Sequence, residues 1–394
     1  MLTDGVLTFL QLITAGAIIL GKANLSEWAW YRSDNADSGW SANPGGSSSG
    51  PAVAVAAGFS PLSIGTEAMG SLIMPSDRAA LYTIKPTLKI VPQEGIIPIT
   101  LEADSAGPMT KSVRDLANLL DVLVDPAKTT VPEGGYQSAV TGTWGDIKIG
   151  VVEPDKWLWP EHIVKPEKEA SDQMLREWKS AYEHLRTIVK VVKPVSLLSL
   201  NEATEDGTRN VWNAFDSTFK GLLESYLGSV DCCKIKTLED LIKFNEDHAD
   251  QELPRSADNQ AGLIRALHAD MREDEYLQLI SFARDRCGTR GIDQVLEDNG
   301  VDILMGPGDG PMMSIAGMAG YPSATLPLGY LDFNGRPFGL QISAKAHQED
   351  LLIQAQSAWE ATFPQRQPPS LDKIVKTGEI SVTPPRAVKI TAGR

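Results

Sequence analysis

Hydrophobic residues along the chain fall into two kinds of segment, short apolar runs and longer segments with helical spacing. The short runs are bounded by glycine, proline or polar residues and predict buried strands at residues 62–67, 147–154, 301–308 and 323–330. Helical spacing predicts helices at residues 113–123 and 172–188, and a run of small residues from Pro51 to Gly58 predicts a third. Buried strands alternating with helices favour an α/β fold with helices on both faces of one sheet.

The start of the chain is strongly apolar. Residues 4–14 predict a buried helix that ends at Gly16, and residues 17–23 predict a buried strand. The apolar stretch carries Asp4 at its start, has no basic n-region and is shorter than the roughly 20 residues of a spanning helix, so neither a signal peptide nor a membrane anchor is favoured. A buried helix at residue four without a strand before it suggests that an N-terminal portion of the fold is absent.

The middle of the chain differs from its two ends. Residues 166–299 are richer in charge and in helical pattern, which predicts a helical excursion or cap. Strand-like sequence returns after this region, so the last quarter is expected to rejoin the same sheet. We therefore predict a single domain over residues 1–394, with the excursion inside it.

Composition and charge disfavour several classes of binding partner. The chain has 51 acidic and 36 basic residues among 394, a formal net charge of −15, which disfavours binding to nucleic acid or to an anionic membrane surface. Three cysteines and five scattered histidines give neither a disulfide framework nor a metal-binding spacing. We therefore expect a cytoplasmic protein with no metal and no organic cofactor.

Candidate chemistry lies in two serine-containing, glycine-rich segments. Ser48 is the centre of a G-x-S-x-G match, but a loop precedes it where a nucleophile elbow requires a strand, so a Ser-His-Asp hydrolase is disfavoured. The alternative is that the serine loop at residues 45–50 and the turn ending at Ser71 bring two hydroxyls together. The successive N–H groups of residues 68–71 would then form an oxyanion hole.

The same segments carry a family resemblance. The chain resembles the amidase-signature hydrolases, in their fungal branch, over segments that span most of its length: residues 15–29, 45–58, 64–76, 84–87, 95–100, 105–121 and 319–342. The resemblance implies a central mixed β-sheet covered by helices and an enzyme that hydrolyses a carboxamide of a small molecule. A setting in secondary metabolism is an analogy with fungal amidases, and a homodimer is left open.

The resemblance also implies roles for individual residues. Ser71 matches the nucleophile that forms an acyl-enzyme, and Ser47 matches the bridging serine, which follows a cis peptide in the family. The backbone amides of Ala68, Met69, Gly70 and Ser71 match the oxyanion hole. A neutral, desolvated lysine acting through a second hydroxyl can activate a serine without histidine, which defines a Ser–Ser–Lys site.

Several positions depart from the family pattern. The family's catalytic lysine falls before residue 1 of this numbering, and Lys22 and Lys85 match structural lysines, so no catalytic lysine is assigned in this chain. Ala68 and Met69 replace the residues usual in the nucleophile turn. Lys89 stands where the family favours glycine, which predicts strain if its φ is positive. The alternative function is therefore a catalytically inactive, amidase-like protein or fragment that binds a ligand or partner without turnover.

Other polar residues near these segments have simpler interpretations. Glu67 and Asp104 lie in turns and are interpreted as residues that order their loops by hydrogen bonding, and neither is assigned as a general acid. The glycine-rich stretch at residues 306–310 lacks the Lys-Ser/Thr of a phosphate-binding loop. By resemblance it borders the substrate pocket.

Overall fold

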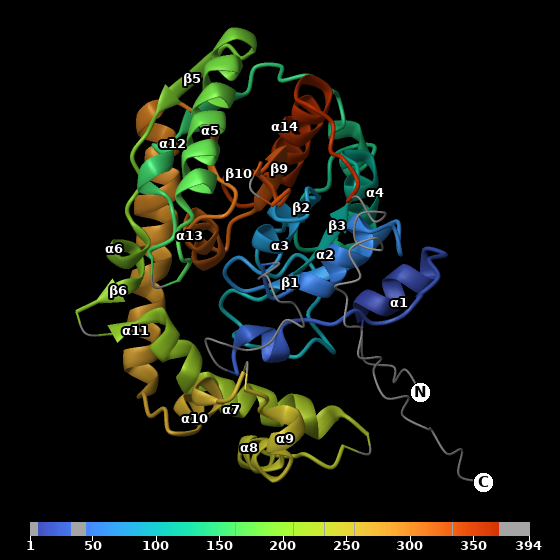
Figure 1. The fold of residues 1–394 in the computed structure, drawn as a ribbon, viewed down its shortest axis with the longest axis vertical. Helices are drawn as coiled ribbons and strands as arrows, with labels where there is room; N and C mark the ends of the chain where they lie inside the picture. The colour runs from blue at the N-terminus through green and yellow to red at the C-terminus, as the bar shows by residue number, and fades with distance from the viewer. Residues whose placement is uncertain are drawn as a thin grey trace.

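The computed structural model describes residues 7–32 and 45–369, apart from residues 162, 208, 232, 256 and 333. Its centre is an eight-stranded sheet with the order β1-β3-β2-β9-β10-β8-β4-β5 (Figure 1). The strands are β1 (Leu62–Glu67), β2 (Tyr82–Lys85), β3 (Ser105–Thr110), β4 (Lys148–Val151), β5 (Val191–Pro194), β8 (Ile303–Pro307), β9 (Ser323–Tyr330) and β10 (Pro337–Ser343). The pairs from β1 to β8 are antiparallel, whereas β8, β4 and β5 run parallel, so the sheet is mixed. This arrangement confirms the predicted α/β fold.

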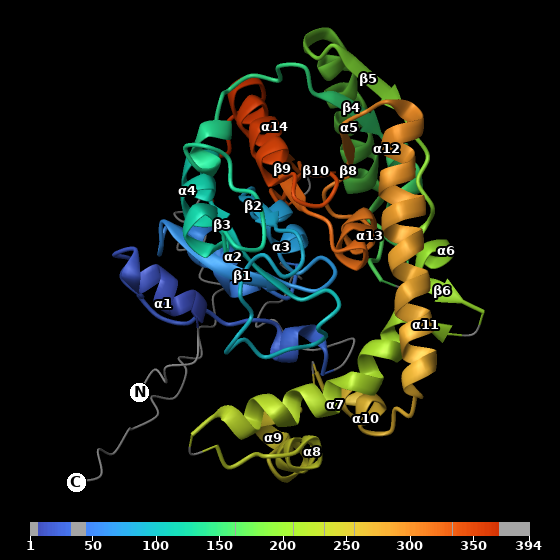
Figure 2. The same ribbon diagram turned by 180° about the vertical axis from the view of Figure 1, so that it is seen from behind.

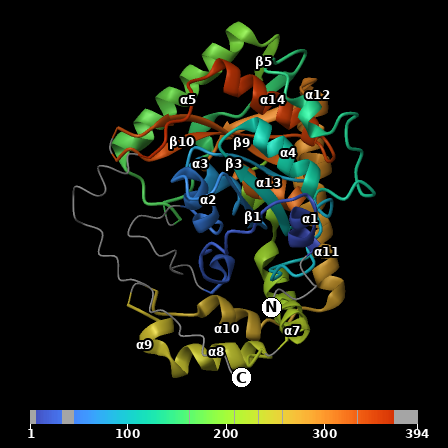
Figure 3. The same cartoon turned by 90° about the vertical axis from the view of Figure 1, so that its right-hand side faces the viewer.

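Helices cover both faces of the sheet, as Figure 3 shows from the side. They are α1 (Leu7–Thr14), α2 (Ser49–Ala56), α3 (Ile73–Asp77), α4 (Val113–Leu123), α5 (Lys168–Ile188), α6 (Leu200–Thr204), α7 (Val211–Ser229), α8 (Leu238–Asp247), α9 (Ala249–Glu252), α10 (Ala261–Leu267), α11 (Glu273–Arg284), α12 (Gln294–Asn299), α13 (Met312–Ala319) and α14 (Glu349–Thr362). The π-helical segment η4 (Asp285–Asp293) joins α11 to α12.

The two faces of the sheet have separate hydrophobic cores because successive strand residues point to opposite sides. In β8, Ile303 and Met305 belong to the core beneath α4, α5 and α14, while Leu304 belongs to the core shared with α13. Burial of both faces explains why these strands appear in the sequence as continuous apolar runs.

The segment 166–299 contains both sheet elements and a helical lobe. The β4–α5–β5 unit is a parallel crossover that extends the main sheet by one edge strand. Helices α7 to α10 then form a lobe below the sheet, and the continuous helix α11–η4–α12 runs from the lobe back along the body (Figures 1 and 2). The lobe has its own core of Phe219, Leu223 and Leu263, among others.

The expectation for the start of the chain was wrong in part. Residues 17–23 form no strand, and the side chains of Ile18 and Leu20 are 84% and 72% exposed. Ile19, between them, packs against the main core, so only one side of this segment is buried. Within the described part of the predicted N-terminal helix, α1 is also only partly buried, with Leu12 inside and Ile13 about half exposed. The apolar composition of residues 17–23 predicted a strand, but no described strand pairs with this segment.

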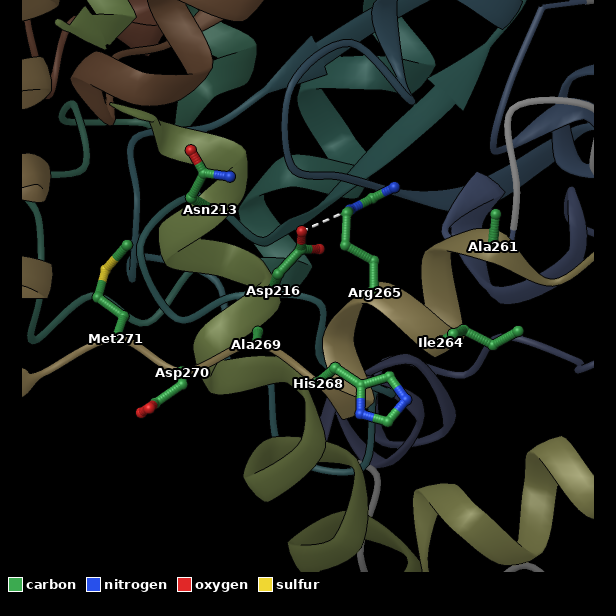
Figure 4. A pocket seen from close by; sticks show the side chains of 9 residues that line it. All are labelled: Asn213, Asp216, Ala261, Ile264, Arg265, His268, Ala269, Asp270 and Met271. Carbon is green, nitrogen blue, oxygen red and sulfur yellow. Dashed lines mark hydrogen bonds and ion pairs between the residues drawn. The ribbon is translucent and has the colours of Figure 1, made fainter. Parts of the chain in front are cut away.

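A buried carboxylate ties the lobe to the N-terminal segment of the chain. Asp216 on α7 accepts a short hydrogen bond from the Tyr31 hydroxyl. It also accepts a 2.5 Å bond from Arg265 Nε on α10, which Figure 4 shows. Burial and this hydrogen bond raise the pKa of Tyr31 above its usual range. The neighbouring Arg32 donates from Nη1 to the backbone oxygens of Ala257 (3.0 Å) and Asn259 (2.6 Å) in the lobe.

Asp216→Ala is expected to lower the free energy of unfolding by about 2 kcal/mol, because it leaves the buried Tyr31 hydroxyl without its acceptor. Urea denaturation of the variant would measure this loss. Asp146→Ala is the matched control, since Asp146 pairs with Lys190 at the surface and its side chain is 91% exposed. Equal stability of the two variants would contradict the anchoring role of Asp216.

Candidate active site

The serine loop and the nucleophile turn lie side by side in the structure. The Ser48 N–H donates to the Ser71 carbonyl at 3.1 Å, which places the loop before α2 against the turn after β1. Ser48 Oγ donates to the Thr66 carbonyl at 2.9 Å and accepts from the Thr66 N–H at 3.0 Å. Ser48 therefore connects the loop to β1, and the structure gives it a role in packing.

Ser47 occupies a buried position beside this contact. Its side chain is fully buried, the Gly46–Ser47 peptide is cis, and its carbonyl accepts from the Ser26 N–H at 3.0 Å. Among the described residues, nothing hydrogen-bonds to Ser47 Oγ. A buried hydroxyl without a partner is uncommon in folded proteins, so this group is available for a further donor or acceptor.

The turn from residue 68 to residue 71 is held from two sides. Glu67 Oε2 accepts the N–H groups of Leu72 at 2.7 Å and Ile73 at 3.0 Å, as expected for a residue that orders the turn. On the other side, Ser314 Oγ of α13 donates to the Met69 carbonyl at 3.2 Å. Gly70 has a φ of +124°, and an added Cβ there would overlap the Met313 thioether.

The four predicted oxyanion-hole amides differ in their surroundings. The Gly70 N–H faces the Glu67 carboxylate and lowers the pKa of that group, against the larger effect of burial, which raises it. Within the described residues, the N–H groups of Ala68, Met69 and Ser71 have no protein acceptor. Backbone donors left unpaired in a turn are the kind of group that binds an anionic oxygen, and the oxyanion hole stays a prediction.

Neither candidate lysine contacts the two serines. Lys22 is exposed, whereas Lys85 is fully buried and donates from Nζ to the Pro86 carbonyl at 2.9 Å. Burial lowers the pKa of Lys85 to about 8, although the charges of Glu67 and Glu349 oppose this effect. That the base role belongs to neither lysine stays a prediction.

Asp104 and the glycine-rich loop each make local polar contacts. Asp104 Oδ2 accepts the N–H groups of Ile99 (2.7 Å) and Thr100 (3.0 Å), and burial raises its pKa to about 7. In the loop at residues 306–310, Asp309 pairs with Arg78 on α3 and accepts from Arg336 at 3.1 Å. The loop is thus joined to the helix that directly follows the nucleophile turn.

Sequence reasoning missed the residues that pack against the two loops. Met313 and Ser314 contact the turn from α13, Trp30 lies against Gly46, and Met74 lies against Gly45. Apolar and serine side chains occur in every part of a protein, so their identity in the sequence does not mark them as neighbours of a site. Trp30 lies in a stretch with two further tryptophans, Trp28 and Trp40, but core or interface packing is the commoner fate of this residue type, so this feature does not single out the site.

The cavity in the lobe is separate from this site, and the described residues provide neither a metal-binding cluster nor a membrane-spanning helix. A cavity of about 540 Å³ lies in the lobe between α7 and α10, lined by Asn213, Asp216, Arg265 and His268 among others, and none of the predicted site residues borders it (Figure 4). No cluster of three histidine, cysteine or acidic side chains in the described ranges could hold a metal ion. Over the same ranges, no helix has the length and apolar character needed to span a bilayer.

Comparison with known proteins identifies the family. The family model described as Amidase matches residues 4–353. The chain belongs to the Amidase family. A "Probable amidase" of Arabidopsis thaliana is 30% identical over 383 residues, which cover 91% of this chain and 70% of the plant protein.

Solved structures agree with this assignment. The native peptide amidase from Stenotrophomonas maltophilia is 33% identical with a TM-score of 0.79, over 93% of this amidase-family chain and 78% of the bacterial one. An amidase family protein from Bacillus anthracis has the same TM-score at 25% identity, over 92% of this chain and 72% of that chain. The predicted family is thereby confirmed, and membership supports hydrolysis of amide bonds in general.

Proposed function

We propose that this protein hydrolyses a carboxamide of a small molecule through an acyl-enzyme on Ser71. The observation that carries the proposal is the junction of the two loops, where the Ser48 N–H bonds to the Ser71 carbonyl. This junction sets Ser71, which is half-buried, beside a loop whose Ser47 hydroxyl is buried and has no partner among the described residues. Membership in the Amidase family supports the same reaction.

The proposed reaction has two steps. Ser71 Oγ attacks the amide carbonyl carbon while its proton passes to Ser47 Oγ, whose own proton passes to a base. The N–H groups of Ala68, Met69 and Ser71 stabilise the negative oxygen that develops. The C–N bond then breaks as the leaving amine takes a proton, and water releases the acid from Ser71 by the reverse sequence of proton transfers.

No residue among those described is assigned as the base of this mechanism. A Ser–Ser–Lys site uses a neutral lysine next to the bridging serine, and no described lysine donates to Ser47 or Ser71. A general base typically contributes 10²- to 10⁴-fold to the rate, so reaction at Ser71 without one would be slow but measurable.

A fluorophosphonate probe tests the proposal because it phosphonylates an activated serine. We expect a single adduct on Ser71, located by peptide mass spectrometry, and no adduct in Ser71→Ala. Release of ammonia from primary carboxamides and of amine from N-substituted amides would then test turnover. Labelling at another serine, with Ser71 unmodified, would contradict the assignment of Ser71 as the nucleophile.

The second candidate is a catalytically inactive amidase-like protein that binds a ligand or partner. The Ser47 hydroxyl favours it, since no basic side chain among the described residues accepts a hydrogen bond from this group. Binding of an amide without turnover, unchanged in Ser71→Ala, would support this candidate. Turnover that Ser71→Ala abolishes would exclude it.

The location, the oligomeric state and the metabolic role of this protein are inferred from the sequence alone. A cytoplasmic location, a homodimer and a role in secondary metabolism stay predictions. The net charge of −15 supports a small neutral or cationic amide over a polyanionic substrate, because the field of the protein repels polyanions.

A further inference from the structure

A short stretch of the chain, residues 24–32, lies between the serine loop and the helical lobe and bonds to both. It is called the connecting segment below. Its turn η1 (Glu27–Trp30) is the short dark blue coil between β1 and α7 in Figures 1 and 2. The proposed mechanism gives this segment no role.

The middle of the connecting segment has an unusual backbone. Trp28, Ala29 and Trp30 have φ angles of +50°, +54° and +73°. Left-handed backbone is costly for residues that carry a Cβ, so it persists only where the surrounding structure holds it. The contacts at the two ends of the segment therefore have to hold this conformation.

The first half of the connecting segment holds the serine loop. The Asn24 carbonyl accepts from the Gly50 N–H at 2.8 Å, and the Ser26 N–H donates to the Ser47 carbonyl at 3.0 Å. An added Cβ on Gly46 would lie only 2.7 Å from Ser26 Oγ, so this half of the segment is in close contact with the loop. The position of Ser47 therefore depends on the position of the segment.

The second half of the connecting segment is attached to the lobe. Tyr31 is 6% exposed, its hydroxyl donates a short hydrogen bond to Asp216 on α7, and its ring centroid lies 4.2 Å from that of Phe219. The Gly262 N–H of α10 donates to the Arg32 carbonyl at 2.8 Å. Hydrogen bonds to a charged group are stronger than those between neutral groups, so the Tyr31–Asp216 bond is expected to contribute strongly to this attachment.

Trp30 connects the two halves of the segment. It directly precedes Tyr31 in the chain, and an added Cβ on Gly46 would lie 3.2 Å from its ring. The Tyr31 N–H donates to the Trp28 carbonyl at 2.8 Å, which keeps the turn closed. A shift of Tyr31 away from the lobe would therefore displace the Trp30 ring relative to Gly46, the residue next to Ser47.

We propose that Tyr31 is a positioning residue for Ser47, acting through the connecting segment. Its bond to Asp216 fixes one half of the segment on the lobe, and the Ser26 N–H in the other half then fixes the Ser47 carbonyl. The role in catalysis rests on the proposed function. The effect on the serine loop does not, because it concerns backbone hydrogen bonds that exist without substrate.

Tyr31→Phe tests this role, since phenylalanine keeps the ring and removes only the hydroxyl. We expect the protection of the Ser26 and Gly50 amides against hydrogen exchange, measured by NMR, to fall about 10-fold relative to the amides of α4, the effect of losing one hydrogen bond to a charged group. The maximal rate of fluorophosphonate labelling of Ser71 should fall by a similar factor. The probe concentration that gives half of this rate should stay unchanged, because the substitution disturbs the serine loop and not the groups that bind the probe.

Tyr321→Phe is the matched control. It removes the 2.6 Å bond from the Tyr321 hydroxyl to the Asp293 carboxylate on η4, so it also breaks a phenol–carboxylate pair. Any general loss of stability should therefore appear in both variants. Only Tyr31→Phe should change the relative protection of Ser26 and Gly50 and the maximal labelling rate.

A double variant tests whether Tyr31 acts through Asp216. Asp216→Ala removes the same bond from the other side, so it should lower the protection of Ser26 and Gly50 at least as much as Tyr31→Phe does. Adding Tyr31→Phe to Asp216→Ala should cause no further fall, because the bond is already absent. A further, additive fall would contradict a shared action of the two residues.

The two proposals fail in different ways. Unchanged relative protection of Ser26 and Gly50 in Tyr31→Phe, or an equal loss in Tyr321→Phe, would overturn the positioning role. Absence of any Ser71 labelling in the unmodified protein would overturn the proposed function, and the exchange measurements would still decide whether Tyr31 positions the serine loop.

Discussion

Ser47→Ala is expected to slow the reaction of Ser71 with a fluorophosphonate by about 100-fold, at the lower end of the usual contribution of a positioned proton acceptor. The Ser47 hydroxyl is buried, has no partner among the described residues and lies in the loop that bonds directly to the Ser71 carbonyl. Alanine removes this hydroxyl and little volume, so the loop should keep its path. The rate of covalent labelling, followed by intact-protein mass spectrometry, measures the effect.

Ser49→Ala is the matched control for this measurement. Ser49 is also buried and follows two residues later, at the first position of α2. Its variant should label at the rate of the unmodified protein. If Ser47→Ala and Ser49→Ala label equally fast, Ser47 has no part in activating Ser71 and the bridging role fails.

The elements that the sequence predicted best are those whose pattern is local. The predicted strands at residues 62–67 and 323–330 and the predicted helix at residues 113–123 coincide with β1, β9 and α4. Each is bounded by glycine, proline or a capping residue. Ser112, for example, caps α4 through a bond from the Asp115 N–H. Lys89 likewise has the positive φ, +72°, anticipated where the family favours glycine.

The features that the sequence did not predict depend on contacts between distant residues. Residues 17–23 look like a strand because they are apolar, but a strand also needs a neighbouring strand that local pattern cannot supply. The contacts of Met313 and Ser314 with the nucleophile turn join segments about 245 residues apart. The sequence suggested that the two serine-containing loops meet, and the assignment of Ser47 and Ser71 within them came from the resemblance. The Ser48–Ser71 contact that joins the loops could not be read from either segment alone.

A buried acid on α3 gives the largest expected effect on stability. Asp77 is 1% exposed, and burial, followed by the charge of Asp309, raises its pKa from 3.8 to about 8, although Arg336 and Arg78 oppose this. Neither carboxylate oxygen has a side-chain partner among the described residues, and only the Gly339 N–H faces the group and lowers its pKa, while Asp309 holds both arginines. We therefore expect Asp77 to be protonated in the folded protein at neutral pH.

The sign of the pH dependence follows from this shift. Because the folded pKa lies above the unfolded value, the folded state binds the extra proton between about pH 4 and pH 8, and stability falls as the pH rises through that range. The full shift corresponds to an upper bound on the order of 5 kcal/mol. Asn resembles the protonated acid, so Asp77→Asn should raise the free energy of unfolding by about 3 kcal/mol at pH 8.5 and by little at pH 4.5.

Urea denaturation of Asp77→Asn at the two pH values checks this expectation, with Asp309→Asn as its counterpart. The pKa of Asp309 is lowered because Arg78 and Arg336 outweigh the cost of its burial, so its charge stabilises the fold. Removing that charge takes away the carboxylate that Arg78 and Arg336 share and should destabilise the protein at pH 8.5. The two neighbouring acids are thus expected to respond in opposite directions to the same substitution, a difference that generic loosening of the loop at residues 306–310 would not produce. A loss of stability in Asp77→Asn at pH 8.5 would show that the Asp77 carboxylate is ionised and paired in the folded state.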